Sequence, residues 1–280
     1  MDIEIRKGIE YARHDGVTLK GDLYAPKAPG KYPVIVAIHG GGWRLGSPEA
    51  YAYWGNWLAA RNHALFAISY RLATPAKKTY PIAVHDVRAA VQFVKGESEK
   101  LKLDPARVAL MGDSAGGHLS ALVALAGDSP IFAGAYRDDP HAGVSTKVKA
   151  VVGVYGVYDL AQQWQHDALA RPRDQITEKF LGAALPDDRR LYFDASPLSY
   201  ATTENNGTAF LLSWGVQDDI VDHAPQSGAF LTALKQAGAF TRTVVMPGAG
   251  HFWMSDPVEE PGSVPGHLAP RLLRFLAERL

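Results

Sequence analysis

The sequence predicts an α/β protein with a mostly parallel sheet that is covered by helices on both faces. Strand-like and helix-like runs alternate along the chain, which is the pattern of parallel strands joined by helical crossovers. The chain has 280 residues, of which 47% are hydrophobic and 21% charged. This is an ordinary globular composition, and the chain is long enough for one large core. No internal repeat, low-complexity tract or linker interrupts it. We therefore expect a single domain over residues 1–280.

Eight segments have the composition of strands in a largely buried sheet. They are residues 3–11, 17–24, 33–38, 64–69, 107–112, 149–154, 208–214 and 241–246. Helix-like segments lie between them, at residues 51–61, 81–95, 114–126, 222–238 and 265–280. The last of these has the apolar spacing of a helix that packs on a core.

Two long stretches fit the sheet poorly. Residues 128–147 are polar after an apolar start, and residues 159–203 contain one helix-like run, at 174–181, amid polar loops. Excursions of this length often form lids over active sites, although they also occur as surface decoration. We treat both stretches as candidate lid segments.

A candidate nucleophile directly follows the strand at 107–112. Gly112-Asp113-Ser114-Ala115-Gly116 fits the G-x-S-x-G pattern, and good helix formers continue to residue 126. In a nucleophile elbow the serine occupies a strained turn between a strand and a helix. The flanking glycines are needed there because a Cβ would collide with neighbouring backbone. The pattern alone also fits a glycine-rich loop with an incidental serine, but the strand and helix around it favour Ser114 as a nucleophile.

A second glycine-rich motif follows the apolar strand at 33–38, with the sequence His39-Gly40-Gly41-Gly42-Trp43. Acyl transfer passes through a tetrahedral intermediate, whose new negative charge needs fixed N–H donors. Consecutive glycines let the backbone come close enough to supply them. We expect the N–H groups of Gly41, Gly42 and Ala115 to be these donors. The alternative is that the glycines form only a flexible turn.

A serine nucleophile needs a base, and on such an elbow an acid and then a histidine follow it along the chain. His251 comes after a strand-like run and the turn Pro247-Gly248-Ala249-Gly250, so a loop at the end of a strand can present its ring. We predict that His251 is the base. Of the other histidines after Ser114, four lie in contexts that fit this role less well, in apparent helix starts or polar loops: His141, His166, His223 and His267.

The strand at 241–246 leads to His251. The acid is expected after the strand before it. That strand, 208–214, is followed by Gly215-Val216-Gln217-Asp218-Asp219-Ile220-Val221. Two adjacent aspartates compete there. Asp219 has another reading, as an acidic residue near the positive end of the following helix.

Together, these motifs resemble those of the α/β-hydrolase esterases, and the resemblance covers nearly the whole chain. The sequence is similar to carboxylesterases with an HGGxW oxyanion motif, a group that includes microbial feruloyl and acetyl-xylan esterases and the kynurenine formamidases. The hormone-sensitive-lipase type is a neighbouring group. His118 stands where that type usually has Asn, its Asp-Pro-Leu motif is absent, and 38 residues before His39 are too few for its N-terminal helical cap.

The resemblance implies an α/β-hydrolase fold with an eight-stranded sheet. It implies a serine hydrolase that cleaves carboxylic esters through an acyl-enzyme. Gly215, Asp218 and Val221 fit the Gly-x-x-Asp-x-x-Val spacing of this superfamily, which favours Asp218 as the acid. The expected triad is therefore Ser114, Asp218 and His251. An arylformamidase would use the same triad, and a non-catalytic binding homologue is a further alternative.

Trp43 and Trp253 adjoin the proposed oxyanion and base loops, and we expect them to line the substrate pocket. If they crowd the reacting carbonyl, short acyl chains should be preferred. The chemistry needs no metal or organic cofactor, and none of the common metal or nucleotide motifs occurs in the sequence.

Charge and composition argue against several other classes of protein. Twenty-nine basic residues balance 29 acidic ones, which favours neither a nucleic acid nor a membrane surface as partner. The chain has no cysteine and thus neither disulfides nor thiolate metal sites. Its first residues alternate like a strand rather than a signal peptide, and no apolar run approaches the roughly 20 residues that span a bilayer. We expect a cytoplasmic protein that acts on a small-molecule ester, while the sequence leaves the oligomeric state open.

Overall fold

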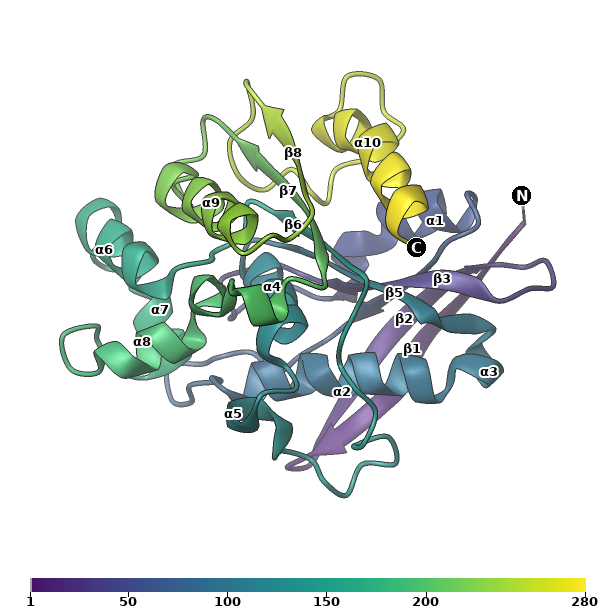
Figure 1. The fold of residues 1–280 in the computed structure, drawn as a ribbon, viewed down its shortest axis with the longest axis horizontal. Coiled ribbons are helices and arrows are strands. Elements are labelled where there is room, and N and C mark those ends of the chain that lie inside the picture. Colours follow the sequence, from purple (N-terminus) through teal and green to yellow (C-terminus); the bar gives the residue numbers. More distant parts are fainter. Residues whose placement is uncertain (1) are drawn as a thin grey trace.

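Eight strands form one sheet in a computed structural model that describes residues 2–280 (Figure 1). The strand order is β1-β2-β4-β3-β5-β6-β7-β8. β1 pairs antiparallel with β2, and β2 antiparallel with β4. From β4 onward, each neighbouring pair in the sheet is parallel. The predicted α/β class and mostly parallel sheet are therefore confirmed.

The strands lie at the predicted places. They are β1 (Ile3–His14), β2 (Val17–Pro26), β3 (Tyr32–Ile38), β4 (Ala64–Ile68), β5 (Leu103–Asp113), β6 (Ala150–Val154), β7 (Ala209–Gly215) and β8 (Thr241–Met246). The helices that match the predicted ones are α1 (Ala52–Ala59), α2 (Ile82–Gly96), α4 (Ala115–Ala126), α9 (Ala229–Gln236) and α10 (Val264–Arg279). The helix predicted over 222–238 begins with a π-helical turn at Ala224–Gly228.

The stretch 159–203 holds more helix than its sequence indicated. Besides α7 (Ile176–Leu181), it contains α6 (Leu160–Ala170) and α8 (Arg189–Ala195). The side chains that α6 buries include Gln163 and Asp167, so its buried face lacks the apolar periodicity that reveals a helix. The remaining short helical segments are α3 (Ser98–Leu101), α5 (Pro130–Ala133), and 3-10 turns at Pro48–Tyr51, Pro197–Tyr200 and Thr203–Asn205.

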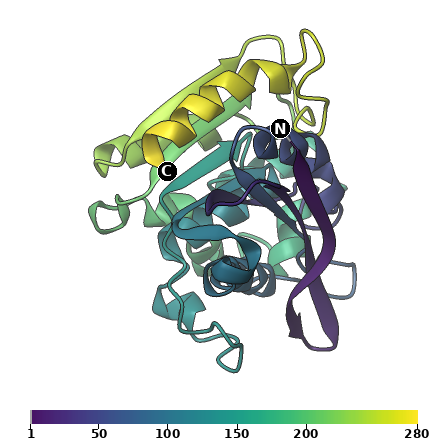
Figure 2. The same cartoon turned by 90° about the vertical axis from the view of Figure 1, so that its right-hand side faces the viewer.

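The core has two layers, one on each face of the sheet. Along β3, Val34, Val36 and Ile38 belong to one buried cluster, whereas Ile35 and Ala37 belong to the other. This alternation follows from the two-residue period of a strand. Helices α2, α4 and α9 contribute to the first cluster, and α1 and α10 to the second. Figure 2 shows α10 lying along the outside of the sheet, with the β1–β2 hairpin at the opposite edge of the molecule.

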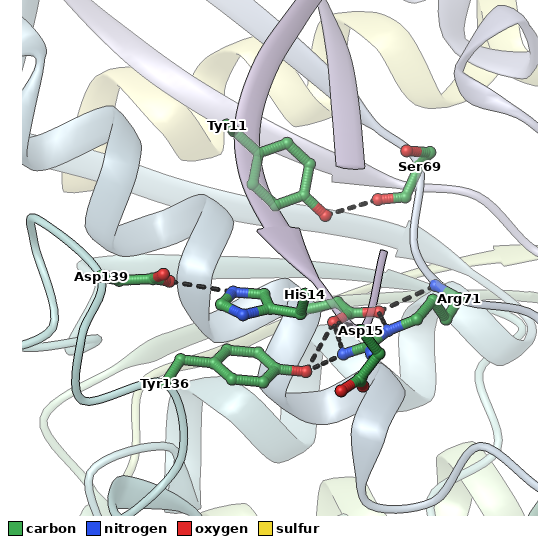
Figure 3. Close-up of polar contacts among 8 residues, drawn as sticks. Tyr11, His14, Asp15, Ser69, Arg71, Tyr136 and Asp139 are labelled. Atoms are coloured by element: carbon green, nitrogen blue, oxygen red, sulfur yellow. Dashed lines mark hydrogen bonds and ion pairs between the residues drawn. The ribbon is translucent and has the colours of Figure 1, made fainter. Parts of the chain in front are cut away.

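A buried ion pair holds the loop that follows β4 (Figure 3). The guanidinium of Arg71 donates to both oxygens of the Asp86 carboxylate on α2, with Nη2 2.6 Å from Oδ1 and Nε 3.0 Å from Oδ2. The backbone N–H of Arg71 also donates to Asp86, and Nη1 donates to Asp15 in the β1–β2 turn. The same loop supports β3, because the hydroxyl of Tyr70 donates to the carbonyl oxygen of His39 at 3.0 Å.

The stretch 128–147 attaches to this cluster. The hydroxyl of Tyr136 donates to Oδ1 of Asp86 at 3.0 Å, and its ring stacks on that of His14 with 3.4 Å between centroids (Figure 3). Nε2 of His14 in turn lies 3.1 Å from Oδ2 of Asp139. These contacts hold the stretch against the N-terminal hairpin and α2. A lid role for it stays a prediction.

Candidate active site

Ser114 occupies a strained turn between β5 and α4. Its φ of +51° is unfavourable for a residue with a side chain. The turn is fixed on both sides, since the N–H of Ser114 donates to Val154 on β6 and its carbonyl oxygen accepts from His118 on α4. A Cβ on Gly112 would overlap backbone of Gly116, and one on Gly116 would overlap the end of β3. This is the geometry of a nucleophile elbow.

His251 and Asp218 are in direct contact. Nδ1 of His251 lies 2.7 Å from Oδ2 of Asp218, and the two side chains are 1% and 0% exposed. The other oxygen, Oδ1, accepts the backbone N–H groups of Ile220 at 3.0 Å and Val221 at 2.9 Å. The carboxylate is therefore held from both sides. Asp219, in contrast, is exposed, so the structure pairs His251 with Asp218 rather than with its neighbour.

The Ser114 turn and the imidazole of His251 both lie at the carboxyl end of β6. Ser114 is bonded to Val154 at the end of β6, and the ring of His251 packs on the next residue, Tyr155, with 4.3 Å between centroids. In a neutral ring whose Nδ1–H donates to the Asp218 carboxylate, Nε2 of His251 has a free lone pair. Nε2 is buried and has no hydrogen-bond partner among residues 2–280. No hydrogen bond therefore joins Nε2 of His251 to Oγ of Ser114 in this structure, and the role of His251 as the base stays a prediction.

The glycine motif after β3 forms a tight turn beside the elbow. Gly41 and Gly42 have φ values of +113° and +59°, and the carbonyl oxygen of Gly41 accepts the N–H groups of Arg44 and Leu45. A Cβ on Gly41 would overlap backbone of Leu45. Within the described part of the chain, the N–H groups of Gly41, Gly42 and Ala115 donate to no protein acceptor. They remain available to an oxyanion.

Asp113 links this turn to the elbow, a contact that the sequence reasoning missed. Its Oδ1 accepts the N–H of Gly40 at 3.0 Å and the hydroxyl of Tyr51 at 2.9 Å. Burial raises the pKa of the Asp113 carboxyl, although these two hydrogen bonds act in the opposite direction. The only sequence signal was its position beside Ser114.

Trp43 supports the glycine turn at residues 39–43, the predicted oxyanion turn, from within the protein. Its indole is buried, and Nε1 donates to Nδ1 of His118 at 3.1 Å. Nε2 of His118 donates to the carbonyl oxygen of Ala195 at the end of α8, 2.8 Å away. Burial lowers the pKa of His118 to about 4, so the ring is neutral near pH 7. The Trp43 ring also stacks on Phe180, with 4.6 Å between centroids.

The stretch 159–203 reaches the oxyanion turn through α7. Besides the Phe180 stack, Asp174 pairs with Arg44 at 2.9 Å, and the side chain of Ile176 lies against Gly42. These contacts form a wall over the turn, and a moving lid stays a prediction. Trp253 is buried and its ring meets that of Tyr155 at nearly a right angle, with 5.0 Å between centroids; contact of Trp43 and Trp253 with substrate stays a prediction.

The other four candidate histidines lie apart from the carboxylate of Asp218. His141 pairs with Glu97, and Nε2 of His166 bonds the carbonyl oxygen of Asp219. His223 stacks on Trp214, and His267 is exposed on α10. Within residues 2–280, no group of three or more acidic or histidine side chains is arranged to hold a metal ion. No helix in this range combines the length and the apolar character that crossing a membrane would require.

The sheet, the elbow and the buried His–Asp pair define a protein of the α/β-hydrolase fold. The chain belongs to the BD-FAE family, whose sequence profile matches residues 21–234. It is 32% identical over 225 residues to esterase LipC of Mycobacterium tuberculosis, a match that covers 78% of this chain and 52% of LipC. The chain spans about half the length of the three curated relatives that it matches over about three quarters or more of its own residues.

Solved structures agree on the fold. The thermophilic esterase Est2 of Thermogutta terrifontis superposes with a TM-score of 0.78 at 24% identity, covering 98% of this chain and 91% of Est2. The same esterase phosphorylated by paraoxon superposes with a TM-score of 0.77 at 23% identity, over 99% of this chain and 94% of that one.

Proposed function

We propose that this protein is a carboxylic ester hydrolase with Ser114 as nucleophile. The observation that carries the proposal is the buried, unpartnered Nε2 of His251, backed by Asp218, at the sheet edge where the Ser114 elbow lies. A neutral imidazole in this state is a proton acceptor. Free N–H groups beside the elbow supply the electrostatic part of acyl-transfer catalysis. The similarity to LipC, an esterase, supports the same reaction class.

In the proposed mechanism, Oγ of Ser114 attacks the ester carbonyl while its proton passes to Nε2 of His251. Asp218 fixes the ring and stabilises the imidazolium that forms. The carbonyl oxygen becomes an oxyanion bonded by the N–H groups of Gly41, Gly42 and Ala115. When the carbon–oxygen bond breaks, His251 returns the proton to the leaving alcohol. Water then attacks the acyl-serine by the same route, which releases the acid and restores Ser114.

We further propose that short acyl groups are preferred. The reacting side chains are almost fully buried, and the oxyanion turn is backed by the Trp43–Phe180 stack. An open groove would add roughly 0.8 kcal/mol of binding for each buried methylene and so reward long chains. A closed pocket would instead exclude them by overlap. The kcat/KM values along p-nitrophenyl esters from acetyl to palmitoyl distinguish the two cases, and a preference for palmitoyl would refute this part of the proposal.

Covalent labelling tests the nucleophile. Paraoxon should form a single adduct on the wild-type protein and none on Ser114→Ala. Ser199→Ala is the matched control, because it removes a serine hydroxyl from the 3-10 turn at Pro197–Tyr200. Ester hydrolysis should be lost with the label, by several orders of magnitude in kcat. Labelling of a folded Ser114→Ala protein at the wild-type rate would refute the assignment.

Rates on an acetate ester and on an N-formyl aryl amide, measured side by side, separate an esterase from an arylformamidase. A cytoplasmic location and a small-molecule ester as the partner remain proposals, and fractionation of the native host would test the first.

A further inference from the structure

Phe252, the residue after His251, combines two unfavourable features. Its φ is +67°, a left-handed conformation that is an outlier for a bulky residue. The residue is also 69% exposed, so burial of the ring does not compensate the strain. Trp253, the next residue, is by contrast almost fully buried. Strain without a packing gain is typical of functional positions.

The exposed ring is aimed at the base. The rings of Phe252 and His251 meet edge to face, with 4.5 Å between centroids and an interplanar angle of 89°. Leu45, whose N–H donates to the carbonyl oxygen of Gly41, is another exposed apolar residue, at 67%. A large apolar side chain in water next to a reacting group is a natural contact for an apolar part of a substrate.

The chemistry decides which part of an ester lies beside Phe252. Nε2 of His251 must return its proton to the leaving oxygen, so that oxygen has to be within hydrogen-bond reach of the imidazole. In the proposed mechanism, the carbonyl oxygen of the ester lies against other groups, the N–H groups of Gly41 and Gly42. The alcohol part of the ester therefore leaves on the side of His251, where the Phe252 ring is.

We infer that Phe252 is a specificity-determining residue that binds the alcohol part of the substrate, and that this alcohol is apolar and aromatic. An exposed phenyl ring favours a second ring over an alkyl chain, because aromatic pairs gain from offset stacking and edge-to-face contacts in addition to the area they bury. This inference rests on the proposed ester hydrolase activity and adds the class of leaving group to it.

The test compares benzyl acetate with ethyl acetate, which share the acyl group and differ in the alcohol. Phe252→Ala should lower kcat/KM for benzyl acetate about five- to tenfold, the factor expected for one aromatic pair, mainly through KM. For ethyl acetate the change should stay within about twofold. Phe252→Trp should keep the preference for benzyl acetate. Phe193→Ala is the matched control. Phe193 on α8 is also an exposed phenylalanine, at 54%, but its ring contacts Arg190 instead of His251.

Equal losses of Phe252→Ala on both esters would show that Phe252 only positions His251, and would overturn the inference. No loss on either ester, or a wild-type protein without preference for benzyl acetate, would overturn it as well. If Phe252→Ala fails to fold, competitive inhibition of the wild type by benzyl alcohol and ethanol decides, and equal inhibition constants count against the inference. Failure of the proposed function is a different result, in which the wild type cleaves neither ester and paraoxon leaves Ser114 unlabelled.

Discussion

Asp218→Asn is the sharpest test of the candidate triad, because the structure dictates how the new amide must lie. Oδ1 of Asp218 accepts two backbone N–H groups, those of Ile220 and Val221, while Oδ2 accepts Nδ1–H of His251. An asparagine has one oxygen and one NH₂ group. The oxygen has to face the two backbone donors, since an NH₂ group there would leave both of them unsatisfied. The NH₂ group is then directed at Nδ1 of His251.

This orientation selects the wrong tautomer of the imidazole. Nδ1 of His251 would accept a hydrogen bond, so the ring proton would move to Nε2, which could no longer take the proton of Ser114. In a serine enzyme this change lowers kcat by about 10⁴, which corresponds to about 5 kcal/mol of transition-state stabilisation. We expect a loss of this size for Asp218→Asn.

The assay is kcat on p-nitrophenyl acetate, with urea unfolding of each variant to check the fold. Asp219→Asn is the matched control, because its carboxylate is exposed one residue further along, and its kcat should stay within about twofold of wild type. A folded Asp218→Asn protein within about tenfold of the wild-type kcat, or a larger loss in Asp219→Asn, would refute this reasoning.

Three further predictions concern stability. Burial lowers the pKa of His118 from its ordinary 6.5 to about 4. The unfolded state then binds a proton first, and up to about 3 kcal/mol that is present above pH 6.5 should be lost as the pH falls towards 4. Urea unfolding at pH 4 and pH 6.5 gives the free energy of unfolding at each end of this range. The difference between the two values should be smaller in His118→Gln than in the wild type, and an equal difference would contradict the prediction. Arg71→Met removes the charged partner of the buried Asp86 carboxylate and should cost about 3 to 5 kcal/mol by the same measurement, whereas a change below about 1 kcal/mol would argue against a structural ion pair. Gly116→Ala should give little folded protein, because its Cβ would overlap the carbonyl oxygen of Ile38, and normal yield with full activity would show that the elbow can shift.

Much of the fold could be predicted because its signals are local. Most strands of the sheet are short apolar runs, β1 alternates polar and apolar residues, and the predicted helices have an apolar face or good helix formers. The turn at Ser114 could be predicted for the same reason. A Cβ on Gly112 would overlap backbone four residues further along, and a Cβ on Gly116 would overlap the adjacent strand β3. Helix α8 was missed because it has only 7 residues, and α6 because no continuous apolar face marks it. The buried face of α6 is partly polar, and its Asp167 forms an ion pair with Arg171.

The sequence by itself determined the class of fold, the order of its elements and a short set of candidate site residues. The spacing of Gly215, Asp218 and Val221 favoured Asp218 over Asp219, but only the tertiary structure shows the contact of this carboxylate with a histidine on another loop. It also showed that Asp113 joins the elbow to the oxyanion turn, and that Trp43 is directed inward to His118. The physical reason is that a local pattern depends on neighbouring residues, whereas these contacts depend on the paths of loops that lie far apart in the chain.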